Sequence, residues 1–147
     1  MITKETNMKK LRSMMIMLAI LQTFNGLSGL AGGFGLINDP SGVALAMKLE
    51  WLQSTPFQSY LIPGLVLFTL NGIGNIIGLV LSLKKHPHSG QYAGLFGAVM
   101  MIWIIAQVSW LGYLSFLQPL YFSTGLLQLV MGIALDRAHK KNYTAVS

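Results

Sequence analysis

Cysteine is missing from this 147-residue chain, and acidic residues are scarce, with only four Asp and Glu against ten Lys and Arg. Without cysteine the chain has no disulfide, no thiolate nucleophile and no Cys-ligated metal or haem. Charged residues of both signs make up 10% of the sequence, whereas hydrophobic residues make up 53%. This balance differs from that of soluble globular domains and indicates one membrane domain.

Four long runs contain no charged residue, and each meets or approaches the about 20 helical residues that a bilayer crossing requires. Because hydrocarbon offers the backbone no hydrogen-bond partners, such runs must be helical. We therefore predict an all-α fold, a four-helix transmembrane bundle, with spans at residues 13–36, 61–83, 92–113 and 119–135. The fourth run is the shortest, and residues 116–118 are available to lengthen it. The first run exceeds the about 7 to 15 residues of a signal-peptide core, so we interpret it as a retained span.

Nine of the ten cations fall in three patches between or beside these runs, and only Lys48 lies elsewhere. Cytoplasmic loops of membrane proteins are rich in Lys and Arg, so the three patches predict one cytoplasmic side. They are the N-terminal residues 1–12 with Lys4, Lys9, Lys10 and Arg12, the loop with Lys84 and Lys85, and the tail 136–147 with Arg137, Lys140 and Lys141. We expect both termini to be cytoplasmic in the inner membrane, with anionic lipid headgroups, and not nucleic acid, facing these patches.

The segment 37–60 between the first two spans is then an external cap. It opens with the turn signature Asn38-Asp39-Pro40-Ser41-Gly42, in which Asp39 is expected to cap the turn. A short helix through residues 48–52 that ends before Pro56 fits the sequence, but the apolar alternation over residues 43–51 also fits a strand. Glu50 is the other acid of the cap, and we expect it to pair with Lys48.

Of the amide side chains inside the predicted spans, four are expected to face one another near the bundle centre. Two of them belong to a repeated Thr-x-Asn-Gly pattern in the first and second spans, and the four are Asn25, Asn71, Gln107 and Gln128. One interpretation is interhelical hydrogen bonding, because hydrocarbon offers an amide no other partner. The alternative is a polar path at the bundle centre, of the kind that transporters use.

No Asp, Glu, Lys, Arg or His lies within any predicted span, which counts against proton-coupled antiporters and voltage sensors. All three histidines lie in the basic patches, at His86, His88 and His139. The His-x-His pair offers two nitrogen ligands, but with no acid or thiol nearby we interpret it as headgroup contact and expect no metal and no cofactor.

Glycine is abundant, at 16 residues, and recurs at four-residue spacings. Small residues four apart let two membrane helices approach closely, either within one chain or across a homodimer seam. These pairs are Gly29 and Gly33, Gly74 and Gly78, and Gly90 and Gly94.

Several short motifs occur together in this chain: Asp39-Pro40-Ser41-Gly42, Leu49-Glu50-Trp51-Leu52, Thr55-Pro56-Phe57, Tyr60-Leu61-Ile62-Pro63-Gly64, and Trp103 through Gln107 to Leu111-Gly112-Tyr113. On these motifs, over about residues 26–135, the chain resembles a group of small uncharacterised bacterial four-span membrane proteins. In span count and size it also resembles the DoxX-like four-helix proteins. The resemblance implies an inner-membrane bundle with an external cap and brings no activity with it.

We therefore expect a non-enzymatic membrane protein, with no catalytic residues, in an accessory, stress-related or lipid-interacting role. The alternative is a carrier or pore for a small neutral or amphipathic solute, with the four amides lining the path and Trp51 gating it. An enzyme acting on a lipid would need Asp39 or Glu50, the only external acids.

Overall fold

The computed structural model describes residues 2–145, and within them it contains helices and no strand. The long elements are α1 (Ile2–Asn38), α2 (Leu61–Val66), the π-helix η3 (Leu67–Ile73), α3 (Gly74–Leu83), α4 (Ser89–Leu111) and α5 (Leu117–Thr144). Because α2, η3 and α3 are continuous, these elements make four helices long and apolar enough to cross a membrane. The predicted all-α bundle of four spans is confirmed.

The first and fourth helices extend beyond the apolar runs. α1 begins at Ile2 rather than near Ser13, and α5 continues to Thr144 through the basic tail. Lys and Glu are good helix formers, and one i,i+4 ion pair supports each extension. These pairs are Lys9 with Glu5 at 3.4 Å and Lys140 with Asp136 at 2.8 Å.

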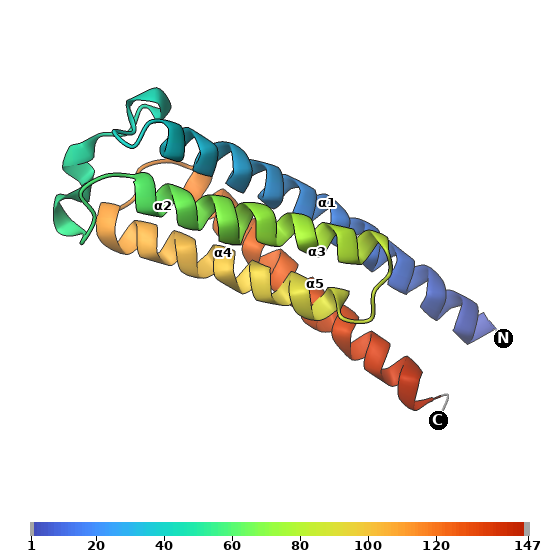
Figure 1. Ribbon diagram of the computed structural model, residues 1–147. Coiled ribbons are helices and arrows are strands. Elements are labelled where there is room, and N and C mark those ends of the chain that lie inside the picture. The colour runs from blue at the N-terminus through green and yellow to red at the C-terminus, as the bar shows by residue number, and fades with distance from the viewer. Residues whose placement is uncertain (1, 146–147) are drawn as a thin grey trace.

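The four spans run side by side, with both termini and the loop between α3 and α4 at one end of the bundle (Figure 1). The segment between α1 and α2 covers the opposite end. The three basic patches therefore share one end and Lys48 lies at the other, as the charge pattern requires. We refer to these ends as the basic end and the cap end.

Glycines set the closest helix contacts. A Cβ added to Gly33 would lie 2.5 Å from the Phe68 backbone N, and one added to Gly29 would lie 2.6 Å from that of Gly72. Backbones at this separation allow dense van der Waals packing, which replaces the hydrophobic drive that is absent in lipid. In the same way Gly97 faces the Gly125 carbonyl, so that α1 pairs with the second span and α4 pairs with α5.

The six glycines of the predicted pairs are all buried within this one chain. Their close packing is therefore intramolecular, since a residue buried in its own chain is not available to a second copy. Homodimerisation stays a prediction, and it would need another surface.

The cap contains two short 3₁₀ helices, η1 (Val43–Leu45) and η2 (Leu49–Ser54). The predicted short helix is thus confirmed, including its end before Pro56, and the strand alternative is wrong. Leu52 of η2 and Tyr60 are buried against Leu36 of α1, and this contact holds the cap on the bundle. The Tyr60 hydroxyl donates to the Lys48 carbonyl at 2.7 Å, and burial raises the pKa of Tyr60.

Candidate functional site

Three buried amides and one half-buried threonine join the spans near the middle of the bundle. Asn25 Nδ2 donates to Gln128 Oε1 at 2.8 Å, and Gln128 Nε2 donates to Asn75 Oδ1 at 2.8 Å. Thr124 Oγ1 donates to Asn25 Oδ1 at 2.9 Å, and Gln128 Nε2 also reaches the Ala93 carbonyl of α4 at 3.0 Å. We call Asn25, Asn75, Thr124 and Gln128 the amide core. It closes the middle of the bundle with hydrogen bonds.

The structure brings together two of the four predicted amides, Asn25 and Gln128. Asn71 is fully buried, but neither its side-chain oxygen nor its nitrogen has a hydrogen-bond partner in the described part of the chain. Gln107 is half-buried, on the cap side of the amide core. The repeated Thr-x-Asn-Gly pattern therefore does not mark two equivalent positions.

The helix geometry of the second span explains why Asn71 does not join the amide core as Asn25 does. In η3 the Gly74 N–H donates to the Thr69 carbonyl, five residues back, so the helix is wider here than an α-helix. Asn71 lies within this π-helix, whereas Asn75 lies one turn later in regular α-helix and bonds Gln128. Sequence reasoning missed Asn75 and Thr124. The signal for Asn75 was its i+4 spacing from Asn71, and the π-helix changes which of the two faces the centre.

A second polar contact joins α1 to α3 nearer the basic end. Ser82 Oγ donates to Gln22 Oε1 at 2.8 Å, and both side chains are buried. The sequence pattern gave no indication of this pair. It leaves the basic half of the bundle closed as well, with Gln22 lying against Gly78.

The cap half of the bundle contains two cavities. A cavity of about 530 Å³ lies between the cap, α1, α4 and α5, and a cavity of about 370 Å³ lies between the cap, the second span and α4. The two share a wall made by Met47, Trp103, Gln107 and Leu111. No charged residue lines either cavity among the described residues, and none of the amide core does. Cavities of this size and apolar character are typical of small-molecule sites.

Gln107 is the polar group that both cavities share. Its side-chain amide makes no hydrogen bond within residues 2–145, although it is only partly exposed. Asn71 borders the smaller cavity, and Ser28 and Gln118 border the larger one. The Gln118 amide is occupied, because it accepts from the Leu114 N–H at 2.8 Å and donates to the Gly112 carbonyl. Gln107 is therefore the unpartnered amide that borders both cavities, whereas Asn71 borders only the smaller one.

The predicted cap residues have three different environments. Asp39 accepts hydrogen bonds from the Ser41 hydroxyl at 2.6 Å and from the Ala44 N–H at 2.8 Å, and these bonds lower its pKa. It is a turn cap, as predicted. Glu50 is exposed and makes no ion pair with Lys48 in the described chain, so that expected pair is wrong. Trp51 lines the larger cavity.

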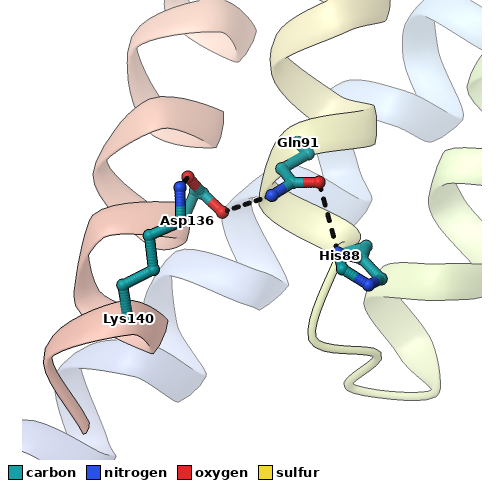
Figure 2. Close-up of polar contacts among 4 residues, drawn as sticks. All are labelled: His88, Gln91, Asp136 and Lys140. Atoms are coloured by element: carbon teal, nitrogen blue, oxygen red, sulfur yellow. Dashed lines mark hydrogen bonds and ion pairs between the residues drawn. The ribbon is translucent and has the colours of Figure 1, made fainter. Parts of the chain in front are cut away.

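At the basic end, a chain of polar contacts joins the α3–α4 loop to α5 (Figure 2). His88 Nδ1 lies 3.2 Å from Gln91 Oε1, Gln91 Nε2 donates to Asp136 Oδ1 at 3.1 Å, and Asp136 pairs with Lys140. Because an amide oxygen only accepts, Nδ1 of His88 carries the hydrogen in this contact. The His86 and His88 rings are 5.4 Å apart, and residues 2–145 contain no group of three His, Cys, Asp or Glu side chains placed to hold a metal.

The cavities present apolar walls and two amides, Gln107 and Asn71, with no hydrogen-bond partner among the described residues, whereas neither Asp39 nor Glu50 lines them. This chain matches no known family model, no curated protein and no solved structure.

Proposed function

We propose that this chain is a non-enzymatic multi-pass protein of the cytoplasmic membrane that binds an uncharged amphiphilic molecule beneath its external cap. The observation that carries the proposal is the pair of apolar cavities that meet at the unpartnered amide of Gln107. The apolar part of such a ligand would pack against the cavity walls. Its hydroxyl, ester or amide head group would form a hydrogen bond with the Gln107 side chain. A charged ligand is disfavoured, because burying a charge without a partner is costly.

The membrane orientation in this proposal rests on charge. The basic end carries nine of the ten Lys and Arg residues, so the positive-inside rule places it, with both termini, in the cytoplasm. The cap and the mouth of the binding site then face outward.

A pore or carrier path along the four predicted amides has less support. Asn25 and Gln128 hydrogen-bond to each other in the amide core, and that core lines neither cavity. A solute entering from the cap end meets closed packing at mid-depth.

The chain contains a natural reporter for this site. Its three tryptophans all line the cavities: Trp51 the larger, Trp110 the smaller and Trp103 both. Brominated groups quench nearby tryptophan, so the test is titration of the full chain in nanodiscs with a brominated monoacylglycerol. We expect saturable quenching. Gln107→Leu, which removes one hydrogen bond at about constant volume, should raise the Kd about fivefold, equivalent to about 1 kcal/mol.

Gln58→Leu is the matched control, because Gln58 is exposed and lines neither cavity. It should bind like the wild type. A brominated alkane without a head group should bind wild type and Gln107→Leu equally. Quenching that rises linearly without saturation, or equal Kd values for Gln107→Leu and wild type, would contradict the proposal.

A further inference from the structure

The lipid-facing side of α1 and α3 carries a groove near the basic end, separate from the cavities under the cap. Its volume is about 750 Å³, and its walls are mainly apolar, with Ile16, Ile20 and Phe24 from α1 and Leu79 from α3. Of the residues that the structure describes, two cations, Arg12 and Lys85, also line it, and no acid does. The groove therefore combines a long apolar surface with positive charge.

The few hydroxyls in the groove are already bonded inside the chain. Thr23 Oγ1 donates to the Ala19 carbonyl at 2.7 Å, and Ser82 Oγ donates to Gln22. Their polar atoms therefore need no hydrogen bond from a bound molecule. The groove wall between the two cations and Leu27 thus acts as an apolar surface. This stretch of α1 is about 22 Å long, which exceeds the about 15 Å hydrocarbon depth of one leaflet.

The cations lie at the depth of lipid headgroups if the amide core marks the bilayer midplane. Counting about 1.5 Å per residue, the end of α3 at Leu83 is about 12 Å along the helix from Asn75, with Lys85 two residues beyond it, and Arg12 is about 20 Å from Asn25. Half of the hydrocarbon core is about 15 Å. Neither cation takes part in an ion pair within residues 2–145, so both are available to an anion.

Lys85 also has an unusual backbone. Its φ is +54°, and the His86 N–H donates to the Leu81 carbonyl at 2.9 Å while the Lys85 N–H donates to that of Ser82. This is the helix ending in which glycine is favoured, because a Cβ is crowded in the left-handed region. Folding alone would favour glycine here, so lysine at this position points to a use for its charge.

We propose that this groove holds one anionic phospholipid, with its phosphate between Arg12 and Lys85 and an acyl chain along the apolar walls. Basic pockets beside membrane helices on the cytoplasmic side are suited to such headgroups. The site requires both the charge and the groove, which distinguishes it from diffuse attraction of the basic end to a negative membrane. It is independent of the cap cavities.

The test is native mass spectrometry of the full chain extracted from vesicles of equal phosphatidylglycerol and phosphatidylcholine. The wild type should retain one phosphatidylglycerol in preference to phosphatidylcholine. Arg12→Gln with Lys85→Gln should lower this preference at least about tenfold. Lys10→Gln with Lys141→Gln removes the same charge from the same end without touching the groove, and should leave the preference unchanged.

Two further variants and a competition with inorganic phosphate test whether a phospholipid occupies the groove. Ala19→Trp fills the groove and keeps both cations, and it should also abolish retention. Lys85→Gly should lose the lipid preference while raising the Tm of the detergent-solubilised protein, which excludes misfolding as the cause. The proposal is overturned if the Lys10 and Lys141 variant loses as much preference as the Arg12 and Lys85 variant, if Ala19→Trp retains the lipid, or if excess inorganic phosphate displaces it.

Discussion

The amide core should stabilise the bundle, and Gln128→Leu is the most informative way to perturb it. Leucine is close to glutamine in volume, so the change removes hydrogen bonds with little effect on packing. Gln128 bonds Asn25 and Asn75 and also reaches the Ala93 carbonyl. After the change, Asn25 Nδ2 and Asn75 Oδ1 lose their partners in a fully buried site.

The expected loss of stability in Gln128→Leu follows from the number of hydrogen bonds that the change removes. Interhelical hydrogen bonds in membrane proteins average about 0.6 kcal/mol and reach about 1.7 kcal/mol. Three interhelical bonds of Gln128 are lost, two to the side chains of Asn25 and Asn75 and one to the Ala93 carbonyl, so the free energy of unfolding should fall by about 2 to 5 kcal/mol. Equilibrium unfolding in mixed micelles, followed by circular dichroism, measures this difference.

Asn71→Leu is the matched comparison, because Asn71 is an equally buried amide whose side chain makes no hydrogen bond within residues 2–145. A buried polar group without a partner costs about 1 to 3 kcal/mol, and the adjoining cavity leaves room for leucine. The variant should therefore be as stable as the wild type or more stable. If Gln128→Leu left stability unchanged, or if both variants lost the same stability, the assignment of the amide core would be refuted.

Further predictions concern the helix contacts and the cap. Gly33→Ala should destabilise the bundle by about 1 to 3 kcal/mol in the same unfolding assay, because its Cβ would lie 2.5 Å from the Phe68 backbone N. Gly94→Ala, whose nearest neighbour would be 3.8 Å away, should be nearly neutral, and equal losses would contradict the packing described. Asp39 has a lowered pKa because it accepts bonds from Ser41 and Ala44, so its stabilisation of the turn is present above its ordinary pKa of 3.8 and is lost as the pH falls through its lower native value. Hydrogen exchange of the Ala44 amide should therefore gain protection as the pH rises through this range, and Asp39→Ala should abolish that dependence; a wild-type profile in the variant would count against the turn.

The sequence was sufficient for the architecture because hydrophobic run length and charge placement are properties of the chain itself. Each predicted span lies largely within a long apolar helix, and the basic patches share one end of the bundle. The helix after Lys48 was also predictable, because Pro56 disfavours helical geometry at Thr55.

The site was less predictable, because it depends on which face of each helix points inward. The π-helix η3 changes that phase between Asn71 and Asn75, and regular periodicity gives no indication of it. The cap cavities depend on how the two helix pairs separate, which local patterns do not encode. Gln107 was identified from its depth in the third span, but its position between two cavities was visible only in three dimensions.

The sidedness of the two ends tests the central claim most directly. Because the chain has no cysteine, Gln53→Cys in the cap and Asn142→Cys in the tail each introduce a single thiol at an exposed position. A membrane-impermeant maleimide applied to intact cells or spheroplasts should label the Gln53→Cys protein at once, and the Asn142→Cys protein only after the membrane is disrupted. Labelling of both proteins, or of neither, before disruption would contradict a four-span chain with its cap outside and its termini inside.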